Sequence, residues 1–221
     1  MRKVFWDDPY KCRLTTKIAS IDGNKILPEE TIIFSFSGGQ ESDRAFINQI
    51  PVVNSEIESN LIYYTVQGNH SFKCNDSIRM EIDWLRRYRL MRLHFAAELV
   101  LEIVTRNWSL EKIGAHIAED KSRIDFTVDK NISSYFDQIL AEYNIIIDNN
   151  MAINTGFSNI DSQKRFWKIE GFSKVACGGT HVKSTAEVGY VSLKRKNIGK
   201  AKERIEITLV DHDKGLLTKY C

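Results

Sequence analysis

Apolar and polar residues alternate through the first third of the chain, as they do in β-strands with one buried face. Leu14 to Ile21 alternates in this way, and the turn sequence Asp22-Gly23-Asn24 leads into a second apolar run at Lys25 to Leu27. The pattern predicts a small β-rich, barrel-like domain over residues 1–83, with further strands at 31–36, 61–66 and 77–82.

The pattern changes after Asp83. From Trp84 to Ile113 there is no glycine or proline, and apolar residues recur at helical spacing. His94 and Glu98 lie beside this apolar stripe, four positions apart, so both side chains share one face of the predicted helix. The stripe itself comprises Trp84, Tyr88, Met91, Phe95 and Leu99.

The remainder of the chain predicts more strands and one more helix. Apolar residues alternate at 113–117 and again at 124–128, which is typical of a hairpin. A helix is expected from Ser133 to Tyr143, capped by Asn131 or Ser133, and strands are expected at 172–176, 190–195 and 204–210. These elements predict an α+β fold, in which the small N-terminal β-barrel-like domain is followed, over residues 84–221, by an α/β sandwich domain with a mainly antiparallel sheet.

The 221 residues carry a formal net charge of +2, which conceals two runs of like sign. One run precedes His94, and the other lies near the C-terminus. Such clusters suit a polyanionic partner, and they are equally typical of solvated faces offset by acidic residues elsewhere. The first run comprises Arg86, Arg87, Arg89 and Arg92, and the second comprises Lys194, Arg195, Lys196, Lys200, Lys202 and Arg204.

Cysteine usage and hydropathy favour a cytoplasmic protein. The four cysteines are widely scattered and show no disulfide-framework spacing, so reduced thiols are expected. The N-terminus reaches Asp7 and Asp8 too soon for a secretory signal, and no apolar run approaches the length of a membrane span. We therefore expect no membrane contact.

Cys177-Gly178-Gly179-Thr180-His181 is the stretch most suggestive of chemistry. It places a thiol and an imidazole four positions apart across two glycines that allow a sharp turn, and both groups are common zinc ligands. His94 and Glu98 offer two more donors from the predicted helix. The pattern predicts a zinc site with four protein ligands, or with three and a water, while a hydrolase that uses Cys177 with a histidine remains an alternative.

A second candidate is the loop Ser37-Gly38-Gly39-Gln40-Glu41-Ser42-Asp43, directly after a predicted strand. Its glycines expose backbone amides that could approach a phosphate or a ribose closely. The loop lacks the Walker A and dinucleotide-binding patterns. A plain β-turn with a polar tip explains it equally well.

Together these motifs resemble the editing domain of alanyl-tRNA synthetase and its free-standing relatives, the AlaX-type alanyl-tRNA editing proteins. The sequence Cys-Gly-Gly-Thr-His-Val at Cys177–Val182 carries most of the likeness. The N-terminal β-rich part makes the chain look like the medium-length form of that family. Three further segments are similar to the family's glycine-rich loop, its hairpin strand and its closing strands, namely Phe36–Asp43, Ser122–Phe126 and Asn197–Ile205.

The resemblance implies a zinc-dependent deacylase that hydrolyses tRNA(Ala) wrongly charged with serine or glycine. The chain is too short to hold an aminoacylation domain as well, so the editing is expected to act in trans. His94, Cys177 and His181 match ligand positions of the family, whereas Glu98 stands where the family has histidine. A carboxylate can also bind zinc, so the resemblance implies that Glu98 is the fourth ligand.

The resemblance also implies a partner and further roles. The partner is the tRNA acceptor end carrying an aminoacyl ester, and no DNA is expected. Gln40 matches an active-site position of the family, and the backbone amides of Gly178 and Gly179 are expected to stabilise the oxyanion. Because Glu98 departs from the family, a non-catalytic or altered-specificity tRNA-binding module with a weakened metal site is the alternative. An esterase for another small aminoacyl substrate is a third.

Overall fold

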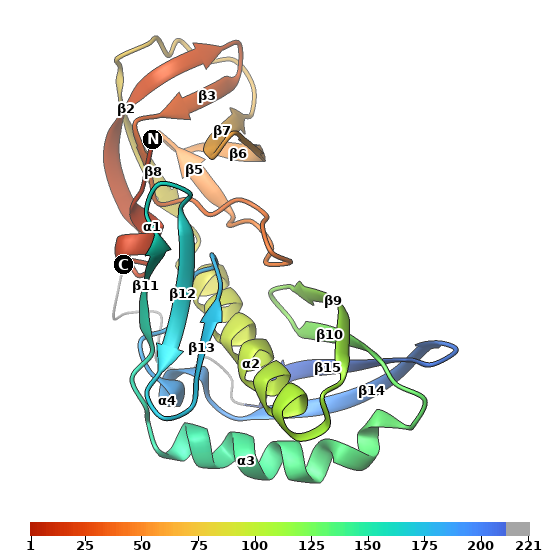
Figure 1. Cartoon of the computed structure of the whole chain (residues 1–221). Coiled ribbons are helices and arrows are strands. Elements are labelled where there is room, and N and C mark those ends of the chain that lie inside the picture. Colours follow the sequence, from red (N-terminus) through yellow and green to blue (C-terminus); the bar gives the residue numbers. More distant parts are fainter. Residues whose placement is uncertain (211–221) are drawn as a thin grey trace. The chain divides into compact units, whose positions relative to one another are not determined.

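The computed structural model of the chain describes residues 1–210 (Figure 1). Its contacts divide the chain into two compact units. The first holds Met1–Ser37 and Glu41–Tyr88, and the second begins at Arg89 and also includes Gly38–Gln40. The division therefore falls inside helix α2 (Trp84–Trp108), and it groups part of the glycine-rich loop with the second unit.

Six antiparallel strands form a closed barrel in the first unit, in the order β2-β3-β7-β6-β5-β8. In β7 and β8 every second side chain is buried, because the pleat turns alternate residues toward the barrel interior. That interior is filled by apolar side chains such as Ile18, Ile26, Tyr64 and Met80, each with no exposed surface. The strands are β2 (Arg13–Asp22), β3 (Lys25–Pro28), β5 (Ala45–Ile47), β6 (Ile50–Glu58), β7 (Leu61–Val66) and β8 (Ser77–Ile82).

Most predicted strands of this unit are confirmed, but the strand expected over residues 31–36 is wrong. Only β4 (Glu30–Thr31) lies in a ladder there, parallel to β1 (Arg2–Lys3), which precedes the helical turn α1 (Val4–Asp7). Beyond β4, side chains satisfy the backbone instead. Thr31 Oγ1 accepts from the Ile33 amide at 3.0 Å, and Asp43 Oδ2 accepts from the Phe34 amide at 2.7 Å.

Four antiparallel strands form the main sheet of the second unit, in the order β14-β15-β10-β9. One face is apolar, and on it Leu90 and Leu93 of α2 pack against Ile117. The other, which we call the outward face, carries Arg123, Asp125, Lys194, Lys196, Lys202, Arg204 and Glu206 on β10, β14 and β15. The strands are β9 (Glu111–Ile117), β10 (Ser122–Thr127), β14 (Val191–Gly199) and β15 (Lys202–Leu209).

Helix α2 is uninterrupted from Trp84 to Trp108 (Figure 1). Asp83 begins it, because its Oδ1 accepts from the Arg86 amide at 3.2 Å, as an N-cap residue does. It ends at Trp108 because Ser109 takes a φ of +52°, which a helix cannot continue. The whole predicted stripe is buried, which confirms the helical spacing.

The rest of the second unit contains a three-stranded antiparallel sheet in the order β11-β12-β13 and two helices. Helix α3 (Phe136–Asp148) follows a 3₁₀ turn (Ile132–Tyr135) whose cap is Asn131, so the predicted helix and one of its predicted caps are confirmed. A mixed α and β structure with mostly antiparallel sheets is likewise confirmed. The remaining elements are β11 (Asn154–Asn159), β12 (Lys164–Ile169), β13 (Ser173–Ala176) and α4 (Thr185–Val188).

Two arginines of the run at residues 86–92 are buried and do not form a basic surface. In the first unit Arg87 is fully buried, and its Nε donates to Asp43 Oδ1 at 2.8 Å. In the second unit Arg92 is 1% exposed and donates to the Val188 carbonyl at 3.0 Å. For Arg87 and Arg92, a polyanion-binding role and a solvated role are therefore both wrong.

Two observations bear on the expected compartment. Within residues 1–210, no helix is both long enough and apolar enough to cross a membrane. Cys74 and Cys177 are free thiols, as expected, and Cys221 lies outside the described residues.

Candidate metal centre

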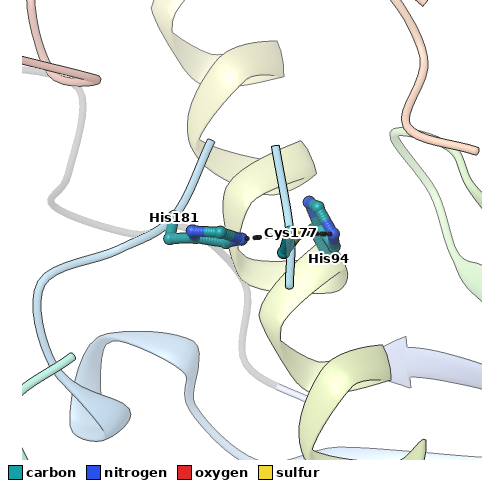
Figure 2. Close-up of side chains that lie close together, drawn as sticks. All are labelled: His94, Cys177 and His181. Atoms are coloured by element: carbon teal, nitrogen blue, oxygen red, sulfur yellow. Dashed lines mark hydrogen bonds between the residues drawn. The ribbon is translucent and has the colours of Figure 1, made fainter. Parts of the chain in front are cut away.

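Two segments of the second unit bring the predicted ligands together. His94 lies on α2, and Cys177 and His181 lie on the loop between β13 and α4. Figure 2 shows Cys177 between the rings of His181 and His94, with a hydrogen bond to each. The ligand atoms of these three residues all lie within 4.8 Å of one another. The cluster could therefore hold a metal ion.

The separations within the cluster can be tested against a tetrahedral ion. Cys177 Sγ lies 3.4 Å from His94 Nε2 and 3.3 Å from His181 Nε2. A tetrahedral zinc with bonds of about 2.3 Å to sulfur and about 2.0–2.1 Å to nitrogen would place those atoms about 3.5 Å apart. The two sulfur–nitrogen separations thus fit such an ion with only small adjustment.

Glu98 touches this cluster from the next turn of α2. Its Oε1 lies 3.4 Å from His94 Nε2, while its Oε2 accepts a hydrogen bond from Trp167 Nε1 at 3.0 Å. Glu98 is not within the mutual 4.8 Å grouping of the other three. The structure therefore brings Glu98 to the edge of the cluster, in contact with His94.

Gln40 fixes the orientation of the His94 ring. Its Oε1 lies 2.7 Å from His94 Nδ1 and also accepts from the Thr180 amide at 3.2 Å, while its Nε2 donates to Thr180 Oγ1 at 2.9 Å. Because a carboxamide oxygen can only accept, Nδ1 must carry a proton, and Nε2 is the ring nitrogen directed toward Cys177. Gln40 has no exposed surface, so it contacts the cluster from the protein interior.

Two glycines make these approaches possible. A Cβ on Gly39 would lie 2.9 Å from the Ala115 carbonyl oxygen, and the Ile117 amide donates to the Gly39 carbonyl at 2.8 Å, so the loop lies directly against β9. A Cβ on Gly179 would lie 2.1 Å from Cε1 of His94. At Gly178 the same space is open. Gly179 is therefore needed for the loop to reach the histidine, and Gly178 is not.

The ionisable groups shift one another's pKa. At His94 burial disfavours the charge, but Cys177 and Glu98 outweigh it and raise the pKa to about 10. Burial is likewise outweighed at Cys177, where His94 and His181 lower the pKa to about 6, and at Glu98, where His94 lowers it to about 2. At neutral pH both acidic groups are thus held as anions, the form in which thiols and carboxylates bind metals.

Two residues of the centre are absent from the predicted set. Thr180 lies inside the Cys177–His181 motif, so its proximity was foreseeable even though its contact with Gln40 was not. Trp167 lies on β12, which the apolar pattern did not reveal because this strand interleaves Arg165 with Trp167 and Ile169 on its buried side. A tryptophan in a short segment carries no signal that its indole faces a glutamate on a distant helix.

The chain is similar to known proteins over most of its length. Residues 165–206 match the family model described as the threonyl and alanyl tRNA synthetase second additional domain. The chain is 31% identical over 215 residues to the alanyl-tRNA editing protein AlaX-M of Pyrococcus horikoshii, which covers 94% of this chain and 97% of that protein. It is 29% identical over 224 residues to AlaX-M of Methanosarcina acetivorans, covering 86% and 91% of the two chains. It is also 28% identical to alanine–tRNA ligase of Methanococcus maripaludis over 92% of this chain and 25% of that enzyme. The chain therefore belongs to the family of AlaX-M alanyl-tRNA editing proteins.

Proposed function

We propose that the protein is a trans-editing hydrolase that deacylates tRNA(Ala) mischarged with serine or glycine, at a zinc site, in the cytoplasm. The observation that carries this proposal is the cluster of His94, Cys177 and His181, whose two sulfur–nitrogen separations match those around a tetrahedral ion. The cluster lies in a chain that matches proteins named for alanyl-tRNA editing over almost their whole length.

In this proposal His94, Cys177 and His181 hold the ion, and Glu98 is the fourth ligand. When bound, zinc would supply a Lewis acid at this site. The hydrogen bond from His94 Nδ1 to Gln40 supports that ligand role, since metal-bound histidines usually donate their other N–H to an oxygen acceptor.

The remaining groups of the centre orient the substrate and the ligands. We assign the backbone amides of Gly178 and Gly179 to the oxyanion that forms when water attacks the ester carbonyl, because they lie on the loop that holds Cys177 and His181. The complete burial of Gln40 supports a positioning role, in which it acts on the reaction through His94.

The tRNA backbone is proposed to meet the outward face of the main sheet. Lys194, Lys196 and Lys202 are exposed there, and the register places the first two on the same side of β14. The only carboxylates among the outward-face residues are Asp125, held by Arg204 at 2.7 Å, and Glu206, bonded to Lys121 at 2.9 Å. The excess of positive charge suits a phosphate backbone, and it predicts salt-dependent binding.

The geometry of Glu98 supports one competing proposal. With one oxygen held by Trp167, Glu98 could leave the metal site weak, and the protein would then be a tRNA-binding module without turnover or with altered specificity. An esterase for another small aminoacyl substrate would keep the metal and lose the tRNA specificity.

A paired experiment tests these proposals. Elemental analysis of the purified protein measures bound zinc, and deacylation assays follow release of the amino acid from seryl-, glycyl- and alanyl-tRNA(Ala). We expect one zinc per chain and hydrolysis of seryl- or glycyl-tRNA with alanyl-tRNA spared. Tight tRNA binding with no turnover under any metal would establish the binding module instead.

Cys177→Ala and Cys74→Ala form a matched pair, because both cysteines are free thiols and only Cys177 belongs to the cluster. We expect zinc and turnover to be lost in Cys177→Ala and kept in Cys74→Ala. Turnover that survives both chelation and Cys177→Ala would overturn the zinc mechanism.

A further inference from the structure

We propose that Trp167 is a positioning residue, which fixes the Glu98 carboxylate so that a single oxygen faces the metal cluster. The inference rests on the proposed zinc site and goes beyond it, because it assigns a role to a residue outside the ligand set. It is carried by the contacts of Glu98. Its Oε2 accepts from Trp167 Nε1 at 3.0 Å, and its Oε1 lies 3.4 Å from His94 Nε2.

The indole is held rigidly enough to act as a positioning group. Trp167 has no exposed surface, and it lies on β12, the central strand of its three-stranded sheet. Its ring packs edge-on against Phe95 of α2, with 5.1 Å between the centroids. The N–H therefore points at Glu98 from a fixed platform, whereas a glutamate on its own has several rotatable bonds.

The hydrogen bond is also obligatory for the indole. An indole has one donor and no acceptor, and a buried donor without a partner is costly. Trp167 Nε1 donates to Glu98 Oε2, so movement of this oxygen toward a metal would leave the indole N–H without an acceptor. The pairing thus reserves one carboxylate oxygen for Trp167 and leaves the other as a single donor atom.

A carboxylate with one free oxygen resembles an imidazole with one free nitrogen in what it offers an ion. His94 is restricted in the same way, because Gln40 occupies its Nδ1. Trp167 and Gln40 thus act on neighbouring residues of α2 by the same device, in which a buried hydrogen bond removes one of two candidate donor atoms. Such outer contacts commonly change metal affinity by about 10–100-fold.

The test is zinc affinity, measured by competition with a chromophoric chelator, in wild type, Trp167→Phe, Glu98→Ala and the double variant. Phenylalanine keeps an aromatic ring and removes the N–H. We expect Trp167→Phe to weaken zinc binding by about 10–100-fold in the presence of Glu98. We expect no further loss from the same substitution in the Glu98→Ala background, because the carboxylate it would orient is gone.

The outcomes separate this inference from the proposed function. A wild-type protein that binds no zinc would overturn the proposed zinc site itself. A wild-type protein that binds zinc, together with a Trp167→Phe variant of unchanged affinity, would overturn only the positioning role. Equal losses in both backgrounds would also overturn it, since a purely structural effect of the smaller ring does not depend on Glu98.

A second measurement keeps the inference testable if Trp167→Phe does not fold. In ¹⁵N-labelled protein the Trp167 indole N–H should exchange slowly with solvent, and it should keep its hydrogen-bonded chemical shift when zinc is added. In Glu98→Ala the signal should move, while those of Trp6, Trp84 and Trp108 stay in place. An indole signal that is unchanged by Glu98→Ala would contradict the hydrogen bond on which the inference stands.

Discussion

Helix α2 and the β14–β15 hairpin both carry runs of basic residues, and the two runs lie in different environments. Arg87 and Arg92 of the helix have at most 1% of their surface exposed, and each donates to named oxygen acceptors. Lys194, Lys196 and Lys202 of the hairpin are exposed. The two runs look alike in sequence and carry the same formal charge per residue.

The difference follows from what the side chains can satisfy. An arginine has five donors in a rigid plane, so a carboxylate and a few carbonyls can saturate it in the interior. Around Arg87, Asp43 and the carbonyls of Pro9 and Ile32 do this. The hairpin lysines alternate outward on a pleated strand and stay in water. A basic run therefore indicates a nucleic-acid surface only where its side chains do not already donate to acceptors within the protein.

The interior of α2 also contains His94 and Glu98, whose partners are arranged differently. Gln40 and Trp167 each take one donor atom of these residues and leave the other directed toward Cys177 or His94. The donors of the buried arginines are satisfied by their partners. His94 and Glu98, by contrast, each keep one atom directed toward the metal cluster. The helix thus contains two kinds of buried polar residue, whereas the basic residues of the hairpin are exposed.

The largest effect is expected from Arg87→Met, which removes the cation and leaves Asp43 buried. Loss of one partner of a buried pair costs about 3–5 kcal/mol of unfolding free energy. Urea denaturation measures the change. Lys194→Met on the hairpin is the control, and it should alter stability by less than about 0.5 kcal/mol. Similar small effects at both positions would erase the distinction between the two basic runs.

Next in size is the effect of a methyl group at Gly179. In Gly179→Ala the new Cβ would collide with the His94 ring, so we expect zinc affinity to fall by at least about 100-fold, equivalent to about 2.7 kcal/mol. Gly178→Ala is the matched control on the same loop, where nothing lies within 4 Å of the added carbon. Chelator competition measures both variants. Equal affinities would show that the His94 position does not depend on the close approach of Gly179.

Some of the features on which these two predictions rest could be predicted from the sequence, and others could not. The apolar stripe of α2 and the Cys177–His181 turn were recognisable because each is a local pattern of spacing. The burial of Arg87 was not, since its partner Asp43 is 44 positions away and no local rule pairs them. Trp167 was missed for the same reason, because the contact with Glu98 spans 69 positions.

A smaller effect is expected from the exposed run. Lys194→Gln with Lys196→Gln should leave stability unchanged and should weaken binding of uncharged tRNA. The slope of log affinity against log salt should fall by about 1.4–1.8, if each lysine meets one phosphate. Filter binding over a salt series measures this, and Lys11→Gln with Lys17→Gln, two exposed lysines of the first unit, is the control. An identical loss in the control would mean that net charge acts and the outward face does not.

The smallest effect is expected at Glu203, a buried residue whose partner is an exposed one. It is buried on β15, yet its partner Arg195 lies on the exposed hairpin, and the hydrogen bond from Arg195 lowers the pKa of Glu203. A depressed folded-state pKa means that the stabilisation is complete above the ordinary carboxyl pKa of about 4.3 and is lost as the pH falls through the folded value. Urea unfolding at pH 7 and at decreasing pH should therefore show Glu203→Gln as the less stable protein at pH 7, with the gap to wild type closing below about pH 4. A stability difference between wild type and Glu203→Gln that stays constant with pH would mean that Glu203 stabilises the hairpin by packing and not by charge. Arg195 would then contribute no ion pair to stability, as expected for the exposed lysines.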